Sequence, residues 1–316
     1  MRSLRQTRGG TTAASRRRPT ATAVRVSRRP SHRHHTAVAT AAAAADATPP
    51  PKIRAILFDC DGVLVSSEHL SRLVAQDVLR ELYGVDAPYA DFIEYGGRGE
   101  ELFLRGPAER HGVASAAFDA DRAKQRFLDL YVDRYASGPR AAELAYPGAA
   151  ALVKALRSAG VRTGVASSAA RRKLDANLQA LVMTAAAADG GYGASSPAPS
   201  IDTFFDSVVA FEPPVTRTKP YPDLFLRAME LASQRVPAMH PPLQPSECVV
   251  VEDAASGVRA AKAAGMWCVG VATTHTQEEL IAFGADAAAR DVSELSVEAL
   301  LGVGEGRQAA GAGGDD

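Results

Sequence analysis

The chain has 316 residues, of which 46% are hydrophobic and 23% charged, and its formal net charge is zero. The charge is unevenly spread, because residues 1–50 contain ten arginines and one acidic residue, which leaves the remainder acidic. A mildly acidic body argues against nucleic acid or an anionic membrane as the main partner. No run of about 18 strongly apolar residues occurs, so no membrane span is expected.

Residues 1–50 are rich in Arg, Ser, Thr and Ala, a composition typical of an organelle transit peptide. The alternative is a disordered tail, and both interpretations exclude this leader from the fold. We expect the chloroplast stroma, with the mitochondrial matrix as the alternative. Three cysteines, Cys60, Cys248 and Cys268, lie in or beside apolar runs without C-x-x-C spacing, which predicts buried reduced thiols.

After the leader, short valine-rich runs alternate with amphipathic segments. Such runs are typical of strands buried on both faces of a parallel sheet. Helices are predicted at 147–160 and 253–265, each ending in glycine. The series predicts an α/β fold with a Rossmann-like, doubly wound parallel sheet. The predicted strands are 53–58, 161–167, 205–210, 248–253 and 267–272.

Residues 66–145 interrupt this series, because they show helical pattern without a convincing strand. We expect them to form an all-helical cap over the carboxyl end of the first strand. The core is then 51–65 with 146–300, and 301–316 is a flexible tail. Segments 184–200 and 236–245 resemble surface-loop expansions because of their Ala, Gly, Ser and Pro content.

Polar residues follow the predicted strands, at the sheet edge where ligands bind. Four carboxylates converging there would repel one another unless a cation lay among them, and oxygen ligands favour Mg²⁺. The residues are Asp59 and Asp61 after the first strand, Ser167 and Ser168 after the second, Lys219 after the third, and Glu252 and Asp253 after the fourth.

Four ordered motifs, "DCDGV" (59–63), the serine in "GVASS" (164–168), "TKPYPDLF" (218–225) and "VVVEDAASGVRAAKAAG" (249–265), resemble the haloacid dehalogenase-like phosphatase superfamily. The resemblance covers about residues 53–290 and includes a helical cap of the β-phosphoglucomutase type. It implies a phosphatase that hydrolyses a small phosphorylated metabolite, with a sugar phosphate as the candidate class, through an aspartyl-phosphate. A monomer is expected.

The resemblance also implies residue roles. Asp59 would be the nucleophile and Asp61 the acid and base, while Ser167 and Lys219 would contact the transferring phosphoryl group. Mg²⁺ would be held by Asp59, Asp253, the backbone carbonyl of Asp61 and, through water, Glu252. Substrate contacts are assigned to Ser168, Arg98 and Gly62: Ser168 has a loop-stabilising role as its alternative, and Gly62 also permits the turn after the first strand.

Three other functions stay open. Sugar phosphomutases of this family carry a cap histidine and an arginine at positions that here hold Ser71 and Gly99, so a phosphatase is favoured. A dehalogenase would not need Asp61. A non-catalytic regulatory or binding module in a plastid would not need every catalytic position filled. The basic segment 170–173 is expected to be a solvated face from which Arg171 could reach a substrate, and His275 is expected on the surface.

Overall fold

The computed structural model describes residues 52–133, 144–188, 200–235 and 241–304, all within the unit Pro49–Asp316. The predicted leader and most of the predicted C-terminal tail lie outside these residues. Within the described ranges, no helix is both long and apolar enough to cross a membrane.

Six parallel strands form one sheet in the order β3-β2-β1-β4-β5-β6. The order confirms the predicted doubly wound α/β fold, since the chain moves outward from β1 to β3 and then returns to the other side of β1. β6 was not predicted, because three alanines carry no strand signal. The strands are β1 (Ala55–Phe58), β2 (Arg162–Ala166), β3 (Ser207–Val209), β4 (Cys248–Glu252), β5 (Trp267–Val271) and β6 (Ala287–Ala289).

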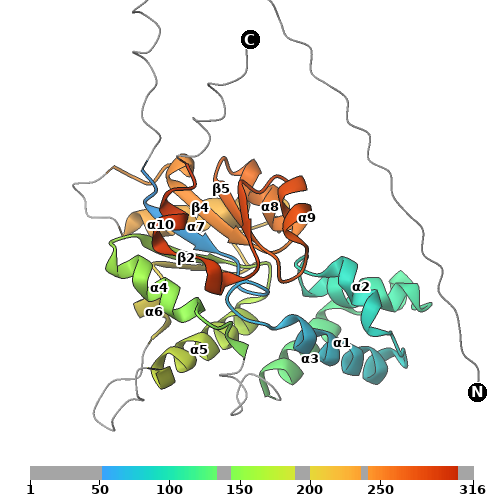
Figure 1. Ribbon diagram of the computed structural model, residues 1–316. Coiled ribbons are helices and arrows are strands. Elements are labelled where there is room, and N and C mark those ends of the chain that lie inside the picture. Colours follow the sequence, from blue (N-terminus) through green and yellow to red (C-terminus); the bar gives the residue numbers. More distant parts are fainter. Residues whose placement is uncertain (1–51, 134–143, 189–199, 236–240, 305–316) are drawn as a thin grey trace, which may run out of the picture. The chain divides into compact units, whose positions relative to one another are not determined.

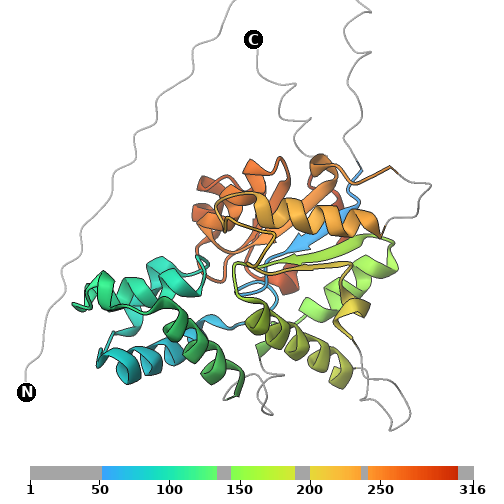
Figure 2. The ribbon, with the colours of Figure 1, turned by 180° about the vertical axis from the view of Figure 1, so that it is seen from behind.

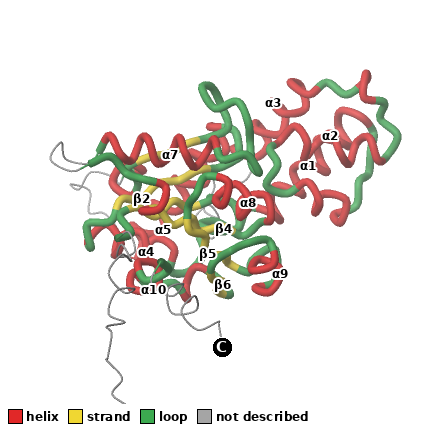
Figure 3. The backbone as a smooth tube through the Cα atoms, turned by 90° about the horizontal axis from the view of Figure 1, so that it is seen from above, coloured by secondary structure: helices red, strands yellow, loops and turns green. Residues whose placement is uncertain are grey.

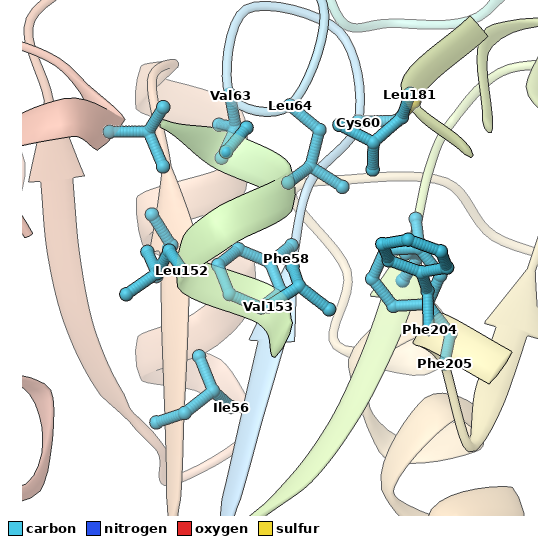
Figure 4. Packing of buried hydrophobic residues seen from close by; sticks show 14 of the residues in the cluster. Ile56, Phe58, Cys60, Val63, Leu64, Leu152, Val153, Leu181, Phe204 and Phe205 are labelled. Carbon is cyan, nitrogen blue, oxygen red and sulfur yellow. The ribbon is translucent and has the colours of Figure 1, made fainter. Parts of the chain in front are cut away.

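Successive residues of β1 serve opposite faces of the sheet. Ile56 and Phe58 pack with Leu152 and Val153 of α4 (Ala149–Ser158) in one core cluster (Figure 4). This cluster also contains residues of α5 (Arg171–Ala188), α6 (Ile201–Phe204) and α10 (Val297–Leu301). Leu57 belongs to the second cluster, together with residues of α7 (Asp223–Gln234), α8 (Ala255–Ala263) and α9 (Gln277–Ala282).

Helices therefore cover both faces of the sheet, which explains why the strands are apolar throughout. Figure 3 shows α7 on one side of the strands and α4 with α10 on the other, and Figure 2 shows α7 from behind. Two short 3₁₀ helices, Pro245–Glu247 and Val292–Glu294, complete this part of the chain.

The surface loop predicted at 184–200 is wrong in its first part, because α5 continues to Ala188. The alanines of this stretch favour a helix, since alanine is the best helix former.

Between β1 and α4 the described chain is helical: α1 (Glu68–Tyr83), α2 (Glu100–Arg110) and α3 (Ala120–Tyr131), with 3₁₀ helices Tyr89–Tyr95 and Ser115–Ala117 (Figure 1). These helices pack around a third cluster that includes Leu79, Leu104 and Phe127. This arrangement supports a helical cap, whereas its boundaries at 66 and 145 stay a prediction. Residues 134–143 lie outside the described ranges.

Candidate active site

The candidate active site lies at the carboxyl ends of β1 and β4, where the direction of strand succession reverses. Asp59 immediately follows β1, and its backbone N–H donates to the carbonyl of Val251 in β4 at 3.0 Å. A cavity of about 110 Å³ opens at this point. Seven of the nine predicted residues line it: Asp59, Asp61, Ser167, Ser168, Lys219, Glu252 and Asp253.

Three buried carboxylates meet in this cavity. Oxygen atoms of Asp59, Glu252 and Asp253 all lie within 4.8 Å of one another. The ammonium group of Lys219 donates hydrogen bonds to Asp59 and, at 2.6 Å, to Glu252. Burial raises the pKa of Asp59 to about 7, and Lys219 opposes this rise. One lysine therefore compensates only part of the negative charge.

This carboxylate cluster fits a hard divalent cation. Its three residues offer oxygen ligands alone, as Mg²⁺ prefers. Burial, and then the neighbouring Glu252 carboxylate, raise the pKa of Asp253 well above its ordinary value. A bound cation would stabilise the ionised form of Asp253 against both effects. Asp61 lies outside this cluster of side chains, so the metal contact predicted for its backbone carbonyl stays a prediction.

Two glycines make room for the carboxylates. A Cβ on Gly62, whose φ is +82°, would lie 2.1 Å from Oδ2 of Asp253. A Cβ on Gly257 in α8 would lie 1.7 Å from Oε1 of Glu252. Gly62 does not itself line the cavity, so its contribution is space for Asp253 and a left-handed turn rather than a substrate contact.

The Asp61 side chain has its own set of donors. The Lys173 ammonium group lies 2.9 Å and the Asn177 amide nitrogen 3.0 Å from its Oδ1, and the Ser67 hydroxyl donates to the same atom. Although burial opposes ionisation, the charge of Lys173 and the hydrogen bonds from Lys173 and Ser67 lower the pKa of Asp61. The carboxylate form is thus favoured.

Sequence reasoning missed Lys173. The segment 170–173 was expected to be a solvated face, but Lys173 is 7% exposed, on the first turn of α5. Arg171, the residue expected to reach a substrate, is exposed and pairs with Asp175 in the same helix. The spacing between Lys173 and Asn177, four residues on a helix that follows β2, was the signal that could have found them.

Ser167 and Ser168 both line the cavity and are buried. The Ser167 hydroxyl accepts a hydrogen bond from the Ala169 backbone N–H at 3.1 Å, which leaves its proton available to an anion. The Ser168 hydroxyl accepts one from Thr218, next to Lys219, at 2.7 Å. This contact agrees with the loop-stabilising alternative for Ser168.

Arg98 is exposed and is not among the residues that line the cavity. The charged side chain that α2 does bring to the cavity is Glu100, which accepts a hydrogen bond from the Ala170 backbone N–H at 2.8 Å. His275 was expected on the surface but lines the cavity, with its Nδ1 3.1 Å from the carbonyl oxygen of Asp253. The Thr274 hydroxyl donates to the Asp253 carboxylate.

The helical insertion supplies the opposite wall of the cavity. Its aromatic and aliphatic residues are Ile93, Tyr95, Phe103 and Phe127, and Ser71 also lies there. Glu68 and Arg72 of α1 add one charge of each sign. Burial, and then the nearby Asp61 carboxylate, raise the pKa of Glu68 to about 7. The wall beyond the carboxylates is therefore mainly apolar with a few polar groups, as in a small-molecule site.

Comparison with known proteins agrees with this geometry. The chain is 40% identical over 253 residues to Protein SUPPRESSOR OF QUENCHING 1, chloroplastic, of Arabidopsis thaliana. The matched region covers 79% of this chain but only 21% of that protein. The chain thus spans about a fifth of the length of this relative.

Two other similarities extend over nearly the whole of the matched proteins. Validoxylamine A 7'-phosphate phosphatase of Streptomyces hygroscopicus subsp. limoneus is 29% identical, covering 77% of this chain and 95% of that protein. The crystal structure of CbbY from Rhodobacter sphaeroides in complex with phosphate has a TM-score of 0.57 and 27% identity, covering 78% of this chain and 99% of that one. The family profile of haloacid dehalogenase-like hydrolases matches residues 53–265. The chain belongs to the haloacid dehalogenase-like hydrolases.

Proposed function

We propose that this hydrolase is a Mg²⁺-dependent phosphatase that releases phosphate from a small phosphorylated metabolite. The observation that carries the proposal is the position of the Asp59 carboxylate at the carboxyl end of β1, where it accepts a hydrogen bond from Lys219 and lies in the same cavity as Asp61. Phosphatases among the similar proteins support this reaction class. The cavity of about 110 Å³ favours a small substrate.

In the first step, an oxygen of Asp59 attacks phosphorus and the bond from phosphorus to the ester oxygen breaks. The leaving oxygen takes a proton from Asp61, which enters this step carrying the proton that it removed from water in the second step of the previous turnover. In the second step, Asp61 removes a proton from water, and the resulting hydroxide oxygen attacks the phosphorus of the aspartyl-phosphate. The bond to Asp59 then breaks, which returns the free carboxylate and inorganic phosphate.

Other residues of the chain bind and orient the phosphoryl group. Lys219 favours the nucleophilic, ionised form of Asp59 against the effect of burial, and it offers positive charge to the phosphoryl oxygens. The Ser167 hydroxyl is placed to donate to one of those oxygens. Asp59, Glu252 and Asp253 would hold Mg²⁺, which supplies charge neutralisation for the phosphoryl group when bound.

A sugar phosphate is the substrate class we favour, and a phosphomutase is the second candidate. Ser71 and Gly99 occupy the two positions where the resembled mutases carry a histidine and an arginine, and both residues line the cavity. Neither side chain can hold a second phosphate by charge. A chloroplast location, in the stroma, is proposed from the composition of residues 1–50 and is supported by the chloroplastic relative.

The test is hydrolysis of 4-nitrophenyl phosphate by the full chain, with Mg²⁺ and with a chelator. We expect Mg²⁺-dependent turnover that Asp59→Asn abolishes, while Asp202→Asn, a matched change on the exposed first turn of α6, leaves it unchanged. A wild-type protein that hydrolyses no phosphate ester with Mg²⁺ present would contradict the proposal and favour a non-catalytic binding module. A screen of sugar monophosphates then identifies the substrate.

A further inference from the structure

We propose that Lys173 and Asn177 of α5 hold Asp61 in the position from which it exchanges protons with the substrate, and that Tyr131 of α3 orients Asn177 for this task. These are positioning residues, since they act through Asp61. The inference rests on the proposed phosphatase function and assigns to it a set of residues outside the four motifs.

The geometry fixes one oxygen of Asp61. Within the described residues, its side chain accepts three hydrogen bonds, from Ser67, Lys173 and Asn177, and all three end on Oδ1. A carboxylate pinned through one oxygen keeps a defined orientation, and the other oxygen is left for proton transfer. Position matters for such a group, because a general acid must come within hydrogen-bond reach of the leaving oxygen.

Lys173 is a costly residue to bury for structural reasons alone. Its ammonium group lies beneath the protein surface, paired with Asp61 and 5.4 Å from the centre of the Tyr131 ring. A buried ion pair rarely stabilises a fold more than apolar residues of similar volume would. The pair is therefore better explained by the placement of a charged group that the reaction needs.

Asn177 is fully buried and has two chemically different ends to its amide. The Tyr131 hydroxyl donates to its Oδ1 at 2.7 Å, and its Nδ2 donates to Asp61 at 3.0 Å. The opposite orientation of the amide would point a carbonyl oxygen at the Asp61 carboxylate, and the two would repel. The Asp61 carboxylate thus selects this orientation, and the Tyr131 hydroxyl, by donating to Oδ1, holds the amide in it.

The hydrogen bonds that link Tyr131, Asn177 and Asp61 connect two parts of the fold. Tyr131 ends α3 of the helical insertion, whereas Asn177 and Lys173 lie on α5 beside the sheet. Arg172 of α5 also pairs with Asp129 of α3, which fastens the same two helices. The support that Asp61 receives therefore depends on contact between α3 and α5.

The test compares two aryl esters with leaving groups of different basicity. Phenolate needs a proton to leave more than 4-nitrophenolate does, so a displaced acid slows the phenyl ester more. We expect Lys173→Met to lower kcat/KM for phenyl phosphate, measured with Mg²⁺, about 10-fold more than for 4-nitrophenyl phosphate. Lys173→Arg should show a smaller difference between the two esters than Lys173→Met, because it keeps the positive charge.

Tyr131→Phe removes only a hydroxyl and should show the same discrimination, to a smaller degree, with a circular-dichroism spectrum like that of the wild type. Arg171→Met, on the exposed face of the same helical turn, is the matched control and should change neither rate. Equal losses on both esters, or none, in Lys173→Met and Tyr131→Phe would overturn the inference. A wild-type protein inactive on both esters would instead overturn the proposed function.

Discussion

Lys219 joins Asp59 and Glu252, two carboxylates at the carboxyl ends of the neighbouring strands β1 and β4. Its ammonium group donates to both, with the Glu252 oxygen at 2.6 Å, and the three side chains are 10% exposed or less. Burial opposes its charge, but the two carboxylates raise the pKa of Lys219 above its ordinary value. The lysine is thus a fixed positive charge on which both acidic residues depend.

Lys219→Met should therefore destabilise the metal-free protein and reduce activity together. Removing one partner of a buried ion pair leaves uncompensated charge, which costs about 3–5 kcal/mol. Urea unfolding at neutral pH measures this loss in the free energy of unfolding. Lys52→Met, at an exposed position, is the control and should change it by less than about 0.5 kcal/mol. A Lys219→Met protein as stable as that control would show that the ion pair carries no such role.

The stability of the metal-free protein should depend on pH through Asp59. Its pKa is about 7 when folded, against a value of 3.8 without the fold, so the folded state binds more protons between these limits. The free energy of unfolding from this group must then fall as pH rises from about 4 to 7. Urea unfolding in a chelator across this range measures the slope, and Asp59→Asn should reduce it.

Added Mg²⁺ should reverse this trend. A cation binds the carboxylate forms of Asp59, Glu252 and Asp253, so its stabilising effect should be larger at about pH 8 than at about pH 5. The shift of the thermal unfolding midpoint on adding Mg²⁺ measures it without any activity assay. Asp253→Asn should diminish the shift at the higher pH. An equal shift in that variant would place the cation elsewhere.

Gly257→Ala should impair the site although alanine is the better helix former. The new methyl group would lie 1.7 Å from Glu252 Oε1 and 1.9 Å from its carboxyl carbon, so the Glu252 carboxylate, which accepts from Lys219, must shift. We expect a loss of kcat on 4-nitrophenyl phosphate together with a weaker response to Mg²⁺. On an undisturbed helix the same change would stabilise by up to about 1 kcal/mol. A more stable and fully active variant would contradict this account of Glu252.

The sequence could predict the sheet and the motif residues, because both depend on local pattern. Apolar runs mark buried strands, and residues that follow parallel strands meet at one edge regardless of side-chain detail. Lys173 and Asn177 escaped because the direction of α5 relative to β1 decides whether they reach Asp61, and no local pattern encodes that direction. Arg98 was assigned to the substrate for its charge, whereas the turn before α2 leaves it exposed.

The three cysteines provide a last prediction, because Cys60 stands between Asp59 and Asp61 and the other two lie in strands. All three are buried as free thiols. Burial raises the pKa of Cys248 to about 12 and moves those of Cys60 and Cys268 upward as well. Since the thiolate is the reactive form, the native protein should not react with Ellman's reagent at about pH 8, whereas the urea-unfolded protein should release three equivalents. Rapid labelling of one thiol in the native state would mean that a strand or the turn between the two aspartates opens far more readily than its burial indicates.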